Sequence, residues 1–188
     1  MRIFKGFDHL PEFSGTAVTV GSFDGVHRGH LFLLERLLEE ARKNQSQSVV
    51  LTFDPHPRVT LHRDEGLHIL TSLEEKALLL EQAGVDNLVV IPFDERFCAL
   101  SGEEFVREYL IRKLGAKTLV AGFNHRFGHD RCDCSSLPES LLKVVRVTAC
   151  DVDGVRVSST VIRNLLDAGR RAEAEKLLGH SLETEFKE

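Results

Sequence analysis

The sequence predicts an α/β fold in which a mainly parallel sheet is doubly wound, with helices on both of its faces. Short β-branched apolar runs alternate along the chain with stretches whose apolar residues recur at helical spacing. This alternation is typical of a parallel sheet, because parallel strands need crossover connections. A chain of 188 residues, 42% of them hydrophobic, is expected to form one domain over residues 1–188.

The first half of the chain is expected to alternate three strands with two helices. Two of these strands run into proline, which ends them because it cannot donate to a strand ladder. Thr71 and Glu74 are expected to form a capping box at the start of the second helix, and Gly84 to end it. The expected order is a strand at 16–20, a helix from 28 to about 41, a strand at 48–53, the capped helix and a strand at 88–91.

The second half of the chain continues the alternation. Ser101 and Glu104 are expected to form another capping box, ahead of a helix that Gly115 ends. Asp153 and Gly154 give a turn signal, with strands expected around it. The expected elements after that helix are a strand at 117–121, strands at 144–148 and 152–157, a helix from 158 to about 168 and a short helix at 171–178.

The loop after the first strand is the first candidate site, because parallel sheets bind ligands beyond the carboxyl ends of their strands. It carries His27 and His30 at the mouth of a helix, where both rings project toward free backbone N–H groups. Gly21, Gly25 and Gly29 allow the backbone to approach a nucleotide closely. The loop therefore predicts an anion site with two extra donors. The alternative is a tight turn with two surface histidines.

A second candidate anion site lies at the start of the helix expected from residue 158. Ser158, Ser159 and Thr160 place hydroxyl groups at its cap and first turn, and Arg163 follows one turn later. Hydroxyls and helix N–H groups bind phosphate, and a guanidinium offers two parallel donors to phosphate oxygens. The alternative is an ordinary helix cap followed by a solvated arginine.

Two further loops at the same sheet edge carry ligand-binding chemistry. The run Phe53, Asp54, Pro55, His56 and Pro57 follows the second strand, and its prolines fix a rigid edge on which a planar ring could rest. The segment 122–128 follows a later strand. Its Asn124 amide can serve a phosphate or a hydrated cation, and Arg126 can pair with a phosphate. A plain strand-ending turn and a surface loop with incidental charges are the alternatives.

Taken in order, these segments resemble a known family. His27-Arg-Gly-His30, FDPHP, GFNHRFG and SSTVIR are similar to motifs of the FMN adenylyltransferase module of prokaryotic bifunctional riboflavin kinase/FAD synthetases, within the HxGH nucleotidylyltransferase superfamily. The resemblance runs from about Thr16 to Leu178. It implies a Rossmann-like, doubly wound, mainly parallel sheet of the nucleotidylyltransferase type.

The resemblance also implies the activity and the residues that serve it. An FAD synthetase transfers AMP from ATP to the phosphate of FMN and releases FAD and pyrophosphate, with Mg²⁺ bridging the ATP phosphates through few protein ligands, near Asn124. The implied catalytic residues are His27, His30, Asn124 and Arg163. The implied ATP contacts are Gly21, Ser22, Phe23, Asp24, His27, Gly29, His30, Ser158, Ser159, Thr160 and Arg163, and the implied FMN contacts are Phe53, Asp54, Pro55, His56, Pro57, Asn124 and Arg126.

Two departures from the family pattern qualify these expectations. In the bifunctional relatives a kinase barrel follows the segment similar to 177–179, whereas nine residues follow Gly179 here. Riboflavin phosphorylation is therefore not expected of this chain, and a separate riboflavin kinase would supply FMN. The run 129–134 replaces a glycine of the relatives, and a stiffer loop there would alter the acceptor contacts but leave the ATP site intact.

Bulk properties exclude several classes of protein. A net charge of -5 with a pI near 6.0 gives no basic field, so nucleic acid is not an expected partner. The chain has no apolar run long enough to span a bilayer, which predicts a cytoplasmic protein. Its cysteines are expected to be reduced thiols, because Cys98, Cys132, Cys134 and Cys150 match neither a disulfide framework nor the usual zinc spacing, although a metal at the Cys132–Cys134 pair is an alternative.

Two rival functions stay open from sequence alone. One is an adenylyltransferase of the same superfamily that uses phosphopantetheine or nicotinamide mononucleotide as acceptor. The other is a non-catalytic module that binds flavin or nucleotide in the same pocket. FDPHP and GFNHRFG argue against the first rival, and release of pyrophosphate would separate the enzyme from the second.

Overall fold

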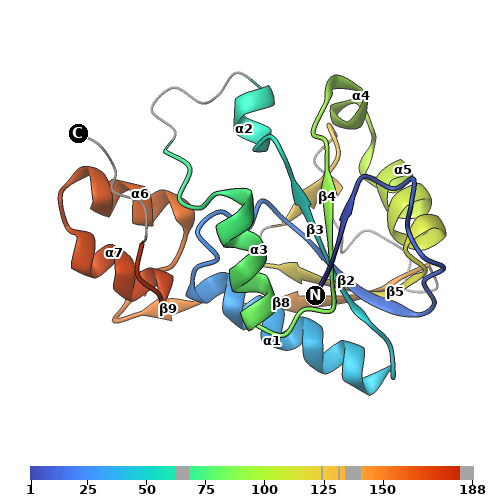
Figure 1. Ribbon diagram of the computed structural model, residues 1–188, viewed down its shortest axis with the longest axis horizontal. Helices are drawn as coiled ribbons and strands as arrows, with labels where there is room; N and C mark the ends of the chain where they lie inside the picture. Colours follow the sequence, from blue (N-terminus) through green and yellow to red (C-terminus); the bar gives the residue numbers. More distant parts are fainter. Residues whose placement is uncertain (62–67, 124, 131, 134–140, 183–188) are drawn as a thin grey trace.

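A six-stranded parallel sheet forms the centre of the protein (Figure 1). The computed structural model describes residues 1–61, 68–123, 125–130, 132–133 and 141–182. The strand order is β1-β4-β3-β2-β5-β8, and every neighbouring pair is parallel. The strands are β1 (Arg2–Lys5), β2 (Thr16–Val20), β3 (Ser48–Phe53), β4 (Asn87–Ile91), β5 (Ala116–Gly122) and β8 (Lys143–Val147). The prediction of a doubly wound, mainly parallel sheet is thereby confirmed.

The sheet changes its winding direction beside its central strand. From β2 the chain passes outward to β3 and then β4, and it later returns to the other side of β2 as β5 and then β8. Loops that leave the carboxyl ends of β2 and β5 therefore diverge to opposite faces. A crevice at such a switch point is where parallel sheets bind ligands.

Helices cover both faces of the sheet, because residues along each buried strand alternate between two apolar clusters. On one face α1 and α3 pack through Leu34, Leu37 and Leu80 against a set that includes Val50. On the other face the segment 102–113 packs through Val106 and its neighbours. The helices are α1 (Arg28–Lys43), α2 (Pro57–Thr60), α3 (Leu73–Gln82), α4 (Glu95–Cys98), α5 (Gly102–Glu104), the π-helix η1 (Phe105–Lys113), α6 (Ser159–Asp167) and α7 (Arg171–Leu178).

The last two helices form a third apolar cluster. Ile162 of α6 and Leu178 of α7 are fully buried, together with Leu70 from the segment that leads into α3. Figure 1 shows both helices at one end of the molecule, beside the sheet. Short antiparallel pairs complete the fold: β6 (Arg126–Phe127) with β7 (Cys132–Asp133), and β9 (Asp151–Val152) with β10 (Val155–Arg156).

The structure corrects three details of the predicted elements. The capping box of α3 is formed by Ser72 and Glu75, one residue later than predicted, because Thr71 instead accepts a hydrogen bond from Gly25 N. The helix after the Ser101 capping box is wound as a π-helix over most of its length. In place of one strand at 152–157, residues 151–152 and 155–156 form the two arms of a short hairpin. The strand expected at 144–148 is β8, which pairs with β5 and not with this hairpin.

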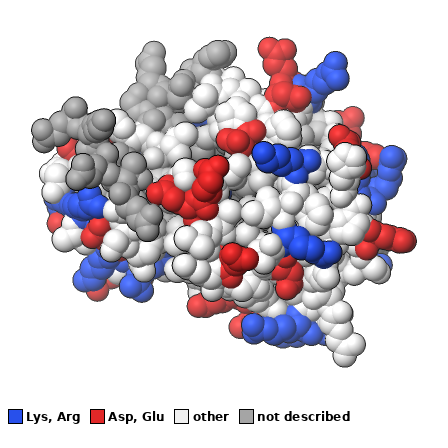
Figure 2. All heavy atoms as spheres, in the orientation of Figure 1, with Lys and Arg blue, Asp and Glu red and all other residues white. Residues whose placement is uncertain are grey.

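The N-terminal strand and the surface charges add two features that bear on the fold and on its partners. The sequence did not predict β1, which hydrogen-bonds to β4 at the sheet edge. On the face that Figure 2 shows, Lys and Arg are interspersed with Asp and Glu, so that neither sign gathers into one patch. Within the part of the chain that the structure describes, every helix is too short or too polar to cross a bilayer.

Candidate active site

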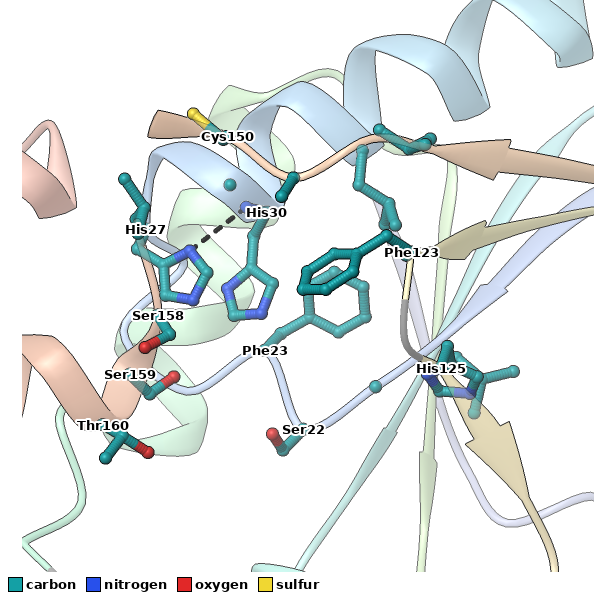
Figure 3. Close-up of a pocket in the computed structure, with 18 of the residues that line it drawn as sticks. Ser22, Phe23, His27, His30, Phe123, His125, Cys150, Ser158, Ser159 and Thr160 are labelled. Carbon is teal, nitrogen blue, oxygen red and sulfur yellow. Dashed lines mark hydrogen bonds between the residues drawn. The ribbon is translucent and has the colours of Figure 1, made fainter. Parts of the chain in front are cut away.

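Two histidine rings are stacked at the start of α1. His27 is the N-cap residue, and its Nδ1 accepts a hydrogen bond from the backbone N–H of His30 at 3.2 Å. The two ring centroids are 3.7 Å apart and the planes differ by 8° (Figure 3). Gly29 leaves room beside the stack, because a Cβ there would lie 3.2 Å from the His27 ring, which is a tight contact. The capping hydrogen bond of His27 and the space at Gly29 therefore allow the two rings to stack.

Both imidazoles are neutral at neutral pH in this environment. Burial lowers the pKa of His27 from 6.5 to about 4, although Asp24 partly opposes the shift. Burial, with the nearby His27, takes the pKa of His30 well below its ordinary value. Because His27 Nδ1 accepts a hydrogen bond, its single proton lies on Nε2. His27 is thereby set as a neutral donor through Nε2.

A cleft of about 550 Å³ opens in front of the stacked rings. It lies beyond the carboxyl ends of β2, β5 and β8, at the switch point of the sheet. Figure 3 shows the α6 hydroxyls along one edge of the cleft and Phe123 with His125 along another. The predicted residues that line it are Gly21, Ser22, Phe23, His27, Gly29, His30, Ser158, Ser159, Thr160, Phe53, His56 and Pro57.

The start of α6 supplies a second set of donors to the cleft. Ser158 is the N-cap of α6 and accepts a hydrogen bond from Val161 N at 3.2 Å. Ser159 Oγ donates to the carbonyl oxygen of Asp24 at 2.9 Å, which joins α6 to the histidine loop. The first N–H groups of a helix have no partner within the helix, so the end of α6 can bind an anion in the cleft.

Asp24 and Arg163 form a buried ion pair behind the cleft rather than on its surface. Asp24 is 1% exposed and Arg163 is 8% exposed, and neither lines the cavity. Asp24 Oδ1 also accepts from Leu70 N at 2.9 Å, and Arg163 Nε donates to His68 O at 2.6 Å. The pair thus ties the histidine loop to α6 and to the segment before α3. Direct contact of either residue with ATP stays a prediction.

A second cavity of about 630 Å³ shares a wall with the cleft. Val20, Phe53, Pro57 and His125 line both spaces. The second cavity is aromatic: Phe93, Phe97 and Phe105 line it, and the Phe53 ring lies 5.1 Å from that of Phe93 and 5.8 Å from that of Phe97. An apolar cavity walled by rings suits a planar aromatic ligand.

The remaining predicted residues differ in whether they line either cavity. Arg126 lines the aromatic cavity, whereas Asp54 and Pro55 line neither space. Asn124 lies outside the residues that the structure describes. The roles of these four residues as FMN contacts stay predictions.

Sequence reasoning missed His125, which stands where the two cavities meet. Burial, helped by the charge of Arg146, lowers the pKa of His125 to about 4, so it is also neutral at neutral pH. Phe123 and Cys150, which line the cleft, were missed as well. The signal for His125 was its place inside the 122–128 segment, but the direction of a loop side chain is not encoded in a local motif.

The thiols and carboxylates of the described segments do not assemble a metal site. Across these segments, the structure brings no three His, Cys, Asp or Glu side chains into a group that could hold a metal ion. Cys98 and Cys150 are free thiols, and Cys134 falls among the residues left undescribed.

The parallel sheet, the cleft at its switch point and the histidine pair at a helix start define an α/β protein of the nucleotidylyltransferase type. Comparison with family models is more specific: the model of the FAD synthetase family matches residues 10–161. The chain belongs to the FAD synthetase family.

Individual relatives agree with this assignment. The chain is 37% identical over 188 residues to a bifunctional riboflavin kinase/FMN adenylyltransferase of Escherichia coli K12, covering 96% of the chain and 60% of the relative. It is 37% identical over 169 residues to a putative enzyme of the same name from Geobacillus thermodenitrificans, covering 89% and 92%. A solved structure described as a macrolide-efflux protein from Streptococcus pneumoniae superimposes with a TM-score of 0.83 at 31% identity, covering 96% of this chain and 62% of that one. The chain is thus homologous to the adenylyltransferase part of the bifunctional enzymes and spans about 60% of the E. coli relative.

Proposed function

We propose that the chain is an FMN adenylyltransferase, which transfers AMP from MgATP to the phosphate of FMN and releases FAD and pyrophosphate. The observation that carries this proposal is the shared wall between two cavities: a cleft with a stacked histidine pair, and an aromatic cavity that meets it at Phe53 and His125. A nucleotide in the first space and a flavin in the second would bring their phosphates together at that wall. Relatives named as FMN adenylyltransferases support the choice of substrates.

The transfer needs alignment and charge neutralisation rather than a protein nucleophile. An oxygen of the FMN phosphate attacks the α-phosphorus of ATP, and a new P–O bond forms there. The bond from that phosphorus to the bridging oxygen of the β-phosphate breaks, and its electron pair leaves on pyrophosphate. Because the attacking group is already an anion, the protein has to hold two phosphates in line and stabilise the charge between them.

Within this proposal the donors of α1 and α6 act on the triphosphate. His30 contacts the α-phosphate, and His27 donates through Nε2 on the side of the leaving pyrophosphate. Ser158, Ser159 and Thr160 bind phosphate oxygens at the start of α6, next to the free N–H groups of that helix. Asp24 and Arg163 hold these two helix ends at a fixed separation through their buried pair.

The acceptor half of the reaction uses the aromatic cavity. The flavin ring packs among Phe53, Phe93 and Phe97, with Pro57 along the shared wall. Arg126, which lines this cavity, pairs with the FMN phosphate. The catalytic role of Asn124 belongs to the same proposal, as the polar contact nearest to the metal.

Mg²⁺ enters this account as part of the substrate MgATP. Phosphate oxygens and water would hold the ion, with few protein ligands. We place the reaction in the cytoplasm, where reduced thiols such as Cys98 and Cys150 persist, with FMN supplied by a separate riboflavin kinase.

The test is a comparison of acceptors with purified protein. Incubation with MgATP and, in separate reactions, FMN, phosphopantetheine or nicotinamide mononucleotide is followed by chromatography of the products and a pyrophosphate assay. We expect FAD and equimolar pyrophosphate with FMN alone. Product with another acceptor would replace FMN in the proposal. Tight FMN binding without pyrophosphate release would identify a binding module instead.

A further inference from the structure

One lysine of α3 is buried beneath the cleft. Lys76 is 6% exposed, and its Nζ makes a single long hydrogen bond, to Thr52 Oγ1 at 3.5 Å. Thr52 in turn donates to the carbonyl oxygen of Ser22, which lines the cleft, at 3.1 Å. Among the described residues, no carboxylate lies within 4.0 Å of this ammonium group.

Lys76 interacts electrostatically with charged groups and histidines around the cleft. Two carboxylates, Asp24 and Asp54, act on it from beyond ion-pair distance, and Asp24 is already paired with Arg163. In the other direction, burial is the main cause of the lowered pKa values of His30 and His56, and the positive charge of Lys76 adds to both shifts. Both of these histidines line the cleft. The lysine is therefore electrostatically coupled to the cleft although it does not line it.

A buried ammonium without a close counter-ion destabilises the folded protein. Removal from water disfavours the charged form, and burial accordingly lowers the pKa of Lys76. A single long hydrogen bond does not offset that loss of hydration. Methionine has a similar length and no charge, so it would fit the same position without the desolvation penalty. The charge at position 76 therefore does not serve stability in the ligand-free protein.

We propose that Lys76 is a positioning residue of the phosphate site, a fixed buried cation that draws the triphosphate onto the floor of the cleft at Ser22 and His30. Its charge acts through the low-dielectric layer formed by Thr52 and the Ser22 backbone, so that a polyphosphate in the cleft adds to the partial compensation that Asp24 and Asp54 give. The identity of that polyphosphate as ATP rests on the proposed function. The affinity of the site for a polyphosphate anion is independent of the proposed function.

The experiment compares Lys76→Met with a matched control, Lys117→Met. Lys117 is exposed and stands near the amino end of β5, at the opposite end of that strand from the cleft, so both variants lose one positive charge. Binding of inorganic tripolyphosphate, MgATP and FMN is measured by calorimetry, and the free energy of unfolding is measured in urea. Lys76→Arg, which keeps the charge, is the third protein in the set.

We expect Lys76→Met to bind tripolyphosphate and MgATP about tenfold more weakly, to bind FMN within about twofold of the wild type and to be at least as stable. Lys76→Arg should recover part of the affinity, and Lys117→Met should match the wild type. Unchanged tripolyphosphate affinity in Lys76→Met would overturn the inference. Reduced stability of Lys76→Met would also overturn it, because it would show a structural role. A wild type that binds tripolyphosphate through Lys76 but forms no FAD would refute the proposed function and leave the inference standing.

Discussion

At the scale of single residues, the site depends on keeping two imidazoles neutral and stacked. The spacing of His27 and His30 in the sequence predicted that both rings face the same way. It could not predict that His27 Nδ1 caps α1 or that the stack leaves Nε2 as the donor, because both follow from the loop backbone. His30 Nδ1 is buried without a hydrogen-bond partner among the described residues, which fits a site completed by a ligand.

Replacement of His30 tests its contact with the α-phosphate. We expect His30→Ala to lower kcat for FAD formation by about a hundredfold or more, because a donor aimed at the developing charge is lost. His9→Ala, at an exposed position away from the cleft, should leave kcat unchanged. Steady-state kinetics with saturating MgATP and FMN measures both variants. Turnover of His30→Ala within about twofold of the wild type would remove His30 from the mechanism.

The buried state of His27 predicts a dependence of stability on pH. Its folded pKa of about 4 lies below the ordinary value of 6.5, so between these values the unfolded chain binds more protons than the folded one. The free energy of unfolding should therefore fall as the pH drops from 6.5 to 4, and His27 should account for up to about 3 kcal/mol of the loss. Urea titrations across this range should show a shallower decline for His27→Gln than for the wild type. Parallel declines would contradict the assignment.

At the scale of elements, one buried ion pair fixes how the helix ends approach each other. Asp24 of the histidine loop reaches Arg163 of α6 and the backbone at Leu70, so three segments that are far apart in sequence meet there. The sequence predicted both residues as ligand contacts, because a local motif does not reveal which charges find one another inside the fold. Gly25 belongs to the same junction, since a Cβ there would lie 2.9 Å from the Leu70 side chain.

Breaking the Asp24–Arg163 ion pair should lower the free energy of unfolding. Asp24→Asn leaves the Arg163 guanidinium buried without its counter-charge, and we expect a loss of about 3 to 5 kcal/mol in the free energy of unfolding. Urea unfolding measures the loss, and combining Asp24→Asn with Arg163→Met should recover part of it. Glu103→Gln, which breaks an exposed pair with Arg107 on the opposite helical layer, should change stability by less than about 1 kcal/mol. A loss of less than about 1 kcal/mol for Asp24→Asn would contradict the role of this ion pair in joining the loop before α1 to α6.

At the scale of the whole molecule, the winding of the sheet sets two cavities side by side. The alternation of strands and helices predicted the parallel sheet and hence the edge at which loops converge. The strand order and the shared wall at Val20 and His125 were not predictable, because they depend on contacts between segments about a hundred residues apart. The π-helical winding of η1 was also missed, since its buried residues recur every four or five positions, close to an α-helical pattern.

The two cavities should respond separately to substitution. Phe97 lines the aromatic cavity, and its ring contacts those of Phe53, Phe93, Phe105 and Tyr109. We expect Phe97→Leu to raise KM for FMN by about tenfold and to leave KM for ATP within about twofold, because Phe97 lines the aromatic cavity and not the cleft. Steady-state kinetics with each substrate varied in turn measures the effect. An equal rise in both KM values would show that the cavities do not hold separate substrates.

Direct transfer between neighbouring substrates is the central claim, and stereochemistry at phosphorus tests it most directly. Adenosine 5′-O-(1-thiotriphosphate) of one configuration, used with FMN, yields thio-FAD whose configuration at the α-phosphorus can be determined. Because the FMN oxygen attacks in line with the departing pyrophosphate, the account predicts inversion of configuration. Retention would require two displacements through a covalent intermediate on the protein, and it would contradict a cleft that only aligns and neutralises its two substrates.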